Sequence, residues 1–245
     1  MKSLFKKEII QFFSSPIGYI SMGIFYLLSS LFLWVMEGPY NIIDHRFADL
    51  SPFFQLAPWI LMFVIAAIGM KTFSEEFRSG TIETLLTKPL KPRDLVLGKF
   101  FALWWAAVFL LIPSLIYVAS VYYLTQEGMQ VEKGIIWSSY FGLILLEGVF
   151  ASIAVFTSLL FKNQVSAFLT AIILMFLFYY GFEGIGNFNL LGSFDYFIQS
   201  LSIKSHYENF IKGLIKIPDI FYFLLLILFF LALSVIQLQK KQYRS

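Results

Sequence analysis

Apolar residues gather in six long runs, and short polar segments separate them. Each run is about 18–27 residues long, and about 20 apolar residues in helical form cross a hydrocarbon core of about 30 Å. The pattern predicts an all-α polytopic membrane protein with one transmembrane domain over residues 1–245, and Pro113 inside the third run predicts a kink there. The spans that we predict are Ile17–Met36, Phe53–Met70, Phe100–Leu124, Ile135–Phe161, Val165–Phe182 and Ile220–Leu238.

Residues 1–16 precede the first span and have an amphipathic pattern of their own. Four apolar residues share one helical face, and Ser14-Ser15-Pro16 ends the pattern because proline does not continue a helix. An interfacial helix along the membrane surface and a plain basic flank of the first span both fit these residues. The four apolar residues are Phe5, Ile9, Phe12 and Phe13.

Residues 183–219, between the fifth and sixth spans, are only partly polar. Two sets of apolar residues recur there with helical spacing. Two short amphipathic helices, which dip into the outer leaflet or cover the exit, would explain both sets. The sets are Phe194, Phe197, Ile198 and Leu201, then Tyr207, Phe210, Ile211 and Leu214.

The basic residues show which side of the membrane each loop faces. The segments on the side of the N-terminus hold 13 Lys and Arg, and the opposite loops hold 5. Acidic residues are distributed the other way, five against nine, with Glu147 inside a span. Since Lys and Arg are enriched on the cytoplasmic side, we expect both termini and residues 71–99 to be cytoplasmic.

The segment 74–99 is the largest polar island in the chain. It carries nine of the 33 charged residues and contains the pattern of a short helix. Thr81 can cap its N-terminus and Glu83 places a carboxylate in its first turn. Pro89 and Pro92 stop it. One face of this helix is apolar and consists of Ile82, Leu85 and Leu86.

These residues resemble the permease subunits of ABC-2 type transporters. The resemblance rests on Glu75-Glu76, on the run Gly80-Thr81-x-Glu83-x-Leu85-Leu86-x-x-Pro89 and on Gly98-Lys99. In that family the segment is a coupling helix that docks into the ATPase subunit. The resemblance implies docking by Gly80, Thr81, Ile82, Glu83, Thr84, Leu85 and Leu86, flanked by Glu75, Glu76, Arg78, Lys88 and Arg93. The alternative is that the apolar face only anchors a loop to the lipid surface.

The same resemblance implies the partners. It implies two copies of an ABC ATPase, which bind ATP and Mg²⁺, and a second copy of this permease or a related chain. It also implies a bacterial inner membrane as the location, and re-entrant helices between the last two spans. The chain is most similar to the gliding-motility (Gld) permease of that family. That similarity implies an accessory membrane subunit with a large periplasmic domain.

Several classes of chemistry are absent from the sequence. With 59% hydrophobic and 13% charged residues, the chain is no soluble domain. It has no cysteine and no G-x-x-x-x-G-K-[ST] run, so we expect no enzyme activity and no cofactor or metal in this chain. His45 and His206 lie in external loops without metal-ligand spacing. The basic residues follow the membrane topology, so we expect no nucleic-acid partner.

Glu147 is the ionisable residue at the centre of a span. A charge there costs roughly 3 kcal/mol, so we expect the carboxyl to be protonated, paired or turned to a polar interior. Two interpretations are open. Glu147 is a group on the substrate path or at a subunit interface, or it is a neutral acid that hydrogen-bonds a Ser or Thr of a neighbouring helix. The second interpretation places it beside Gly148, where we expect backbones to approach closely. A proton-coupled secondary carrier that uses Glu147, and a membrane motor or scaffold without transport, are the alternatives to a permease.

Overall fold

The structure is a computed structural model, and it describes residues 2–42, 49–81, 91–124, 132–186, 192 and 198–242. In these ranges the chain forms helices and no strand. The helices are α1 (Lys2–Ser14), α2 (Pro16–Trp34), α3 (Ser51–Gly69), α4 (Lys71–Ser79), α6 (Pro92–Leu111), α7 (Leu115–Leu124), α8 (Lys133–Leu160), α9 (Gln164–Phe176), the π-helix η1 (Leu177–Gly181), α10 (Phe182–Gly186), α12 (Ile203–Ile211) and α13 (Ile217–Gln242).

Six helices of the described residues are long and apolar enough to cross a membrane, which confirms the predicted fold class. Most of them continue beyond the predicted spans, because a helix can extend past the end of an apolar run. The second span continues through α4, the third begins at Pro92 and the fifth continues through η1 and α10. The observed helices are Pro16–Trp34, Ser51–Ser79, Pro92–Leu124, Lys133–Leu160, Gln164–Gly186 and Ile217–Gln242.

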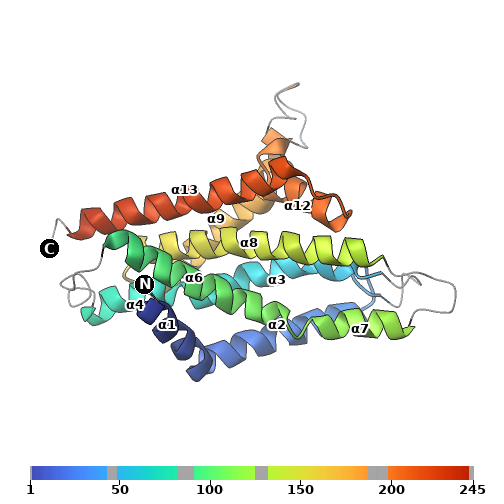
Figure 1. The fold of residues 1–245 in the computed structure, drawn as a ribbon, viewed down its shortest axis with the longest axis horizontal. Coiled ribbons are helices and arrows are strands. Elements are labelled where there is room, and N and C mark those ends of the chain that lie inside the picture. The colour runs from blue at the N-terminus through green and yellow to red at the C-terminus, as the bar shows by residue number, and fades with distance from the viewer. Residues whose placement is uncertain are drawn as a thin grey trace.

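Local sequence explains where the helices begin and break. The Ser15 side chain accepts a hydrogen bond from the Gly18 amide and caps α2, so α1 is a separate helix that meets α2 at an angle (Figure 1). Asn163 caps α9 in the same way. The predicted kink at Pro113 is present, because α6 ends at Leu111 and α7 begins at Leu115.

Helix α8 is the centre of the bundle, and α3, α4, α6, α9, α12 and α13 all pack against it. Small residues allow these close approaches. A Cβ on Gly69 of α3 would lie 2.5 Å from Cβ of Ala154, and a Cβ on Gly148 would lie 2.9 Å from Cδ1 of Ile227. At Gly148 the close neighbours are side-chain atoms of Ile227 and Trp104, so the close approach of backbones that we predicted there stays a prediction.

The spans run side by side and define two ends of the molecule (Figure 1). We call the end where α1 begins and α13 ends the terminal end. Residues 71–81 and 91–99 lie there, together with the turn between α8 and α9. The opposite end, which we call the distal end, carries α7, the start of α8 and α12.

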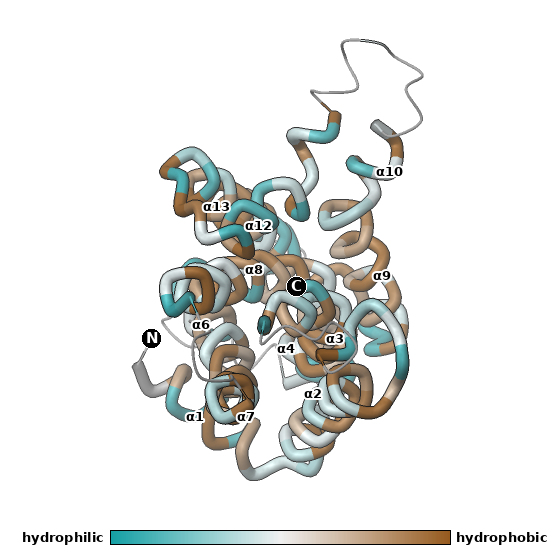
Figure 2. Tube along the Cα trace, turned by 90° about the vertical axis from the view of Figure 1, so that its right-hand side faces the viewer, coloured by the Kyte–Doolittle hydropathy of each residue, from teal (hydrophilic) through white to brown (hydrophobic). Residues whose placement is uncertain are grey.

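Apolar side chains cover the outside of the bundle as well as its interior. Leu27 of α2, Ile173 of α9 and Leu228 of α13 are exposed. Seen from the distal end, α9 and α10 stand out at one side of the bundle (Figure 2). An apolar exterior on helices of this length is what a multi-pass membrane protein requires.

Helix α12 lies in the segment 183–219, where we expected amphipathic helices. Its apolar face is buried by the protein itself, since Ile203, Tyr207 and Phe210 are all fully buried. The Tyr207 hydroxyl donates to the backbone oxygen of Phe54, 2.9 Å away. The helix thus covers the distal half of α8. Phe194 and Phe197, part of the other predicted helix, lie outside the described residues.

Candidate functional site

The predicted docking segment begins where α4 ends. Gly80 terminates α4 in the left-handed conformation, with φ of 71°, which glycine adopts without a steric penalty. The Ser79 and Thr81 hydroxyls are 2.8 Å apart. The predicted docking residues Ile82, Glu83, Thr84, Leu85 and Leu86, and the flanking Lys88, lie outside the described residues.

Helix α4 is amphipathic, and this explains why it persists beyond the membrane-length run. Phe73 and Ser74 are buried, and Phe77 packs on the core. Glu75 and Arg78 are exposed on the other side. The helix therefore attaches the predicted docking segment directly to the bundle at the terminal end.

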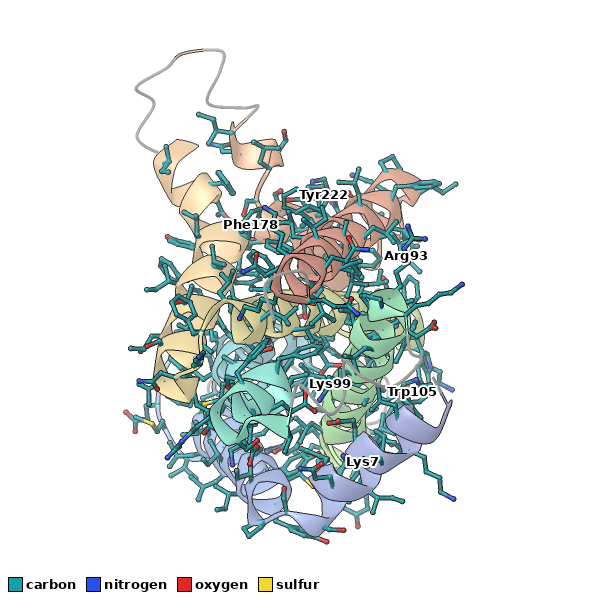
Figure 3. All side chains as sticks on the ribbon, turned by 90° about the vertical axis from the view of Figure 1, so that its left-hand side faces the viewer. Lys7, Arg93, Lys99, Trp105, Phe178 and Tyr222 are labelled. Atoms are coloured by element: carbon teal, nitrogen blue, oxygen red, sulfur yellow. The ribbon has the colours of Figure 1, made fainter. Side chains whose placement is uncertain are left out.

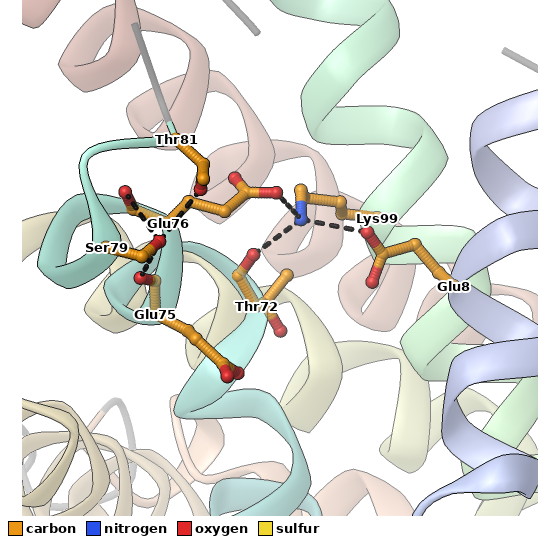
Figure 4. A network of polar contacts seen from close by, with 7 residues as sticks. All are labelled: Glu8, Thr72, Glu75, Glu76, Ser79, Thr81 and Lys99. Carbon is orange, nitrogen blue, oxygen red and sulfur yellow. Dashed lines mark hydrogen bonds and ion pairs between the residues drawn. The ribbon is translucent and has the colours of Figure 1, made fainter. Parts of the chain in front are cut away.

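A buried ion cluster joins α4 to two other helices (Figure 4). Nζ of Lys99, in α6, lies 2.8 Å from Oε1 of Glu76 in α4 and 3.0 Å from Oε1 of Glu8 in α1. It also donates to the backbone oxygen of Thr72 at 2.6 Å. The Lys99 side chain is 2% exposed, and it lies inside the bundle when the terminal end is viewed directly (Figure 3).

The composition of this cluster makes it sensitive to the positions of the three helices. A buried ammonium loses its hydration, and only close acceptors compensate for that loss. Lys99 has three such acceptors from α1 and α4, and the Phe73 ring lies 5.0 Å away. A movement of α4 relative to α6 would separate these groups. We therefore expect the three helices to move together.

The sequence motif includes Glu76 as a flanking residue but does not predict the cluster. Lys99 belongs to the same motif, where it has no role of its own. A signal is present in the sequence, because Lys99 directly precedes the apolar run that begins at Phe100, where a charge needs a partner. Of the other flanking residues, Arg93 lies at the periphery of the bundle (Figure 3).

A cleft of about 480 Å³ opens beside the cluster, between α1, α4 and α6. Lys7, Gln11 and Glu75 line its polar side, whereas Phe12 and Leu103 line its apolar side. Glycine lets α1 approach this closely, since a Cβ on Gly98 would lie 2.9 Å from Cδ2 of Leu4. Helix α1 is thus packed on α6, and is more than a basic flank of the first span.

A second contact fastens the other side of α4. Lys241, near the end of α13, donates to the backbone oxygen of Leu159 at 2.6 Å, and its Nζ lies 3.7 Å from the centroid of the Phe77 ring. The oxygen belongs to the last turn of α8, whose carbonyls have no partner within the helix. Helix α4 is therefore fixed between α1 and α6 on one side and α8 and α13 on the other.

Glu147 is fully buried in α8. Among the described residues, neither of its carboxyl oxygens has a hydrogen-bond partner, so the alternative of a neutral acid bonded to a Ser or Thr hydroxyl is not observed. The neighbouring Trp104 indole donates instead to the backbone oxygen of Ile144 at 2.9 Å. The assignment of Glu147 to a substrate path or a subunit interface stays a prediction.

The structure describes one of the two histidines. His45 lies outside the described residues. His206, in α12, is held by two hydrogen bonds, to Asp219 and to the backbone of Ser200. In the described part of the chain, no three acidic or histidine side chains gather as metal ligands would.

Comparison with known families gives a match over almost the whole sequence. The model of the family described as ABC-2 family transporter protein matches residues 3–243. No curated protein matches the chain.

Proposed function

Because the chain belongs to the ABC-2 family of transporter proteins, we propose that it is the membrane-spanning permease subunit of an ATP-driven transporter. A separate ATPase subunit, in two copies, binds and hydrolyses ATP with Mg²⁺, and this chain has no enzyme activity of its own. A second copy of the permease, or a related chain, completes the membrane part. The complex lies in a bacterial inner membrane with the terminal end in the cytoplasm, as the excess of basic residues at that end supports.

The observation that carries this proposal is the ion cluster at the base of the predicted docking segment. Glu76 lies four residues before Gly80 and is joined through Lys99 to α1 and α6. A force applied to residues 80–86 would reach α4 first. The cluster and the Phe77–Lys241 contact would then carry it into α1, α6 and α13, which tilts the spans relative to one another.

A finer proposal concerns what the complex moves. The sequence resembles the gliding-motility permease, so we propose a complex that moves an accessory membrane subunit with a large periplasmic domain. Force transmission and transport both need the same docking element. A census of the subunits that co-purify with the native chain would distinguish the two, because only force transmission requires that subunit.

The docking proposal is tested by changing the apolar face of the segment. Burial of three aliphatic side chains in a partner contributes roughly 4–8 kcal/mol before ordering costs are subtracted. Leu85→Asp with Leu86→Asp should therefore release the ATPase during co-purification, while the permease stays inserted because no span is altered. Glu83→Lys should weaken the association less, since it removes one first-turn carboxylate.

The matched control is Leu214→Asp with Ile215→Asp, which places the same two charges on exposed residues of the distal end. That variant should retain the ATPase. Full retention of the ATPase by the Leu85 and Leu86 variant would show that the segment is a lipid anchor and that docking occurs elsewhere.

A further inference from the structure

His206 lies at the distal end with a hydrogen-bond acceptor at each ring nitrogen. Its Nδ1 is 2.7 Å from Oδ1 of Asp219, and its Nε2 is 2.9 Å from the backbone oxygen of Ser200. A neutral imidazole carries one N–H, and a backbone carbonyl only accepts. Both hydrogen bonds therefore require two protons, shared between the ring and the Asp219 carboxyl.

The surroundings hold the ring in this position. The imidazole stacks on the Tyr222 ring with centroids 4.0 Å apart and an interplanar angle of 21°. The second oxygen of Asp219 accepts from Nδ2 of Asn209 at 2.8 Å. The Asp219 side chain is 5% exposed, so its carboxylate is poorly hydrated and depends on these donors.

The contacts fasten α12 to the start of α13 and to the turn that precedes α12. Ser200 ends the helical residues 198–200 just before that turn. His206 and Asn209 belong to α12, and Asp219 and Tyr222 to α13. The Tyr222 hydroxyl donates to the backbone oxygen of Leu201 as well. Release of His206 would therefore loosen α12, the helix that covers the distal half of α8.

We propose that His206 and Asp219 form a proton-dependent clasp that holds α12 against α13 and opens when the solution at the distal end becomes more alkaline. The fastened arrangement holds one more proton than the released arrangement with a neutral ring. Raising the pH therefore favours release, and lowering it favours closure. Histidine is the side chain that ordinarily titrates between about pH 5 and 8.

The other titratable groups at this place have partners of their own. From the side of α13 these are Lys216, whose Nζ is 3.4 Å from Oδ1 of Asn209, and Tyr222. On α12, Lys204 pairs with Glu183 of α10 at 2.7 Å and with Glu208 at 3.6 Å, and Lys212 pairs with Glu208 at 3.4 Å. Burial lowers the pKa of Lys204, but the hydrogen bond and ion pair with Glu183 outweigh it and raise the pKa, so Lys204 stays charged.

A cysteine placed under α12 reports the opening, because the natural chain has no cysteine. Ser139 of α8 is fully buried, and its hydroxyl lies 3.4 Å from the backbone oxygen of Phe210 in α12. We would measure the labelling rate of Ser139→Cys by a charged, water-soluble thiol reagent in the full-length protein between pH 5.5 and 8. Division by the rate of the exposed Gly134→Cys at each pH corrects for the reactivity of the thiolate.

The corrected rate should rise about ten-fold or more from pH 5.5 to 8, the factor expected when one charge-assisted hydrogen bond is lost. His206→Phe keeps a ring for the stack on Tyr222 but binds no proton. In that background the corrected rate should be high and independent of pH. Asp219→Asn should likewise remove most of the pH dependence.

Two results would overturn the clasp. One is a corrected rate that does not change with pH while His206 is present. The other is a pH dependence that persists unchanged in His206→Phe and His206→Gln. If the Ser139 variant does not fold, amide exchange of residues 203–211 in the cysteine-free chain, corrected for the chemical exchange rate, gives the same decision.

Discussion

At the scale of single residues, Lys99 organises the terminal end. Its ammonium lies between the carboxylates of Glu8 and Glu76 with almost no exposure to solvent. Glu76 can be singled out from the sequence because it belongs to a motif. The contact between Lys99 and Glu8 cannot be predicted from the sequence, because periodicity and hydropathy describe neighbours along a helix and not contacts between helices.

Removal of the Lys99 charge should destabilise the protein strongly. Lys99→Met keeps the length of the side chain but leaves two carboxylates, 20% and 14% exposed, without their cation. Loss of one partner from a buried ion pair costs about 3–5 kcal/mol. We expect a clearly lower thermal midpoint in detergent, whereas the exposed Lys7→Met should change stability by less than about 0.5 kcal/mol.

Partial recovery in the triple variant Lys99→Met, Glu8→Gln, Glu76→Gln would show that the unpaired carboxylates cause the loss. An unchanged thermal midpoint for Lys99→Met alone would mean that the cluster does not hold α1, α4 and α6 together. Movement driven by ATP turnover in the assembled complex would then have to reach the bundle through other contacts.

Glu147 is a second residue whose position the sequence reveals but whose contacts it does not. Its position inside a span is evident from the sequence, because charged residues are rare there. Which groups surround the carboxyl depends on the packing of α8. Ser152, five residues further along α8, donates its hydroxyl to the backbone oxygen of Val149 instead.

At the scale of elements, the spans are predictable from the sequence and their extensions are not. Six apolar runs identify six spans because the bilayer fixes a minimum length. Past those runs, α4 and the first turns of α6 are stabilised by packing against α8 and α1, which hydropathy does not report. The amphipathic pattern of α12 is also visible, but the pattern shows only that one face is apolar and not whether lipid or protein covers it.

Close helix packing gives a prediction at this scale. Gly69→Ala should destabilise the protein by about 1–3 kcal/mol, because the new Cβ would lie 2.5 Å from Cβ of Ala154 and force α3 away from α8. Gly23→Ala is the matched control in α2, where a Cβ meets no atom within 4 Å. It should be neutral or stabilising by up to about 1 kcal/mol, as alanine favours a helix over glycine. Equal thermal midpoints for the two variants would contradict the close contact between α3 and α8.

At the scale of the whole molecule, the six spans bring the start of α1, the end of α13 and residues 71–81 and 91–99 to one end (Figure 1). The distribution of Lys and Arg along the sequence predicts the same grouping. The two results are independent, since one comes from charge and the other from packing. Which end faces the cytoplasm rests on the charge alone.

Thiol labelling in intact cells tests that orientation. Ser79→Cys, exposed at the terminal end, should be protected from an impermeant reagent added outside, and Lys212→Cys, at the distal end, should react readily. The cysteine-free chain gives the blank. After the cells are opened, both variants should react. Labelling of Ser79→Cys in sealed cells would reverse the topology.

The ion cluster also sets an order for the synthesis of the protein. Glu8 and Lys99 are 91 residues apart, so α1 leaves the ribosome long before the residues that receive it exist. Two spans must enter the membrane, and a third must start, before Glu8 finds its cation. Until then α1 can rest only on lipid or on a chaperone, which its apolar face permits. Helix α1 therefore reaches its place beside α6 only after the second span has entered the membrane and the third has begun.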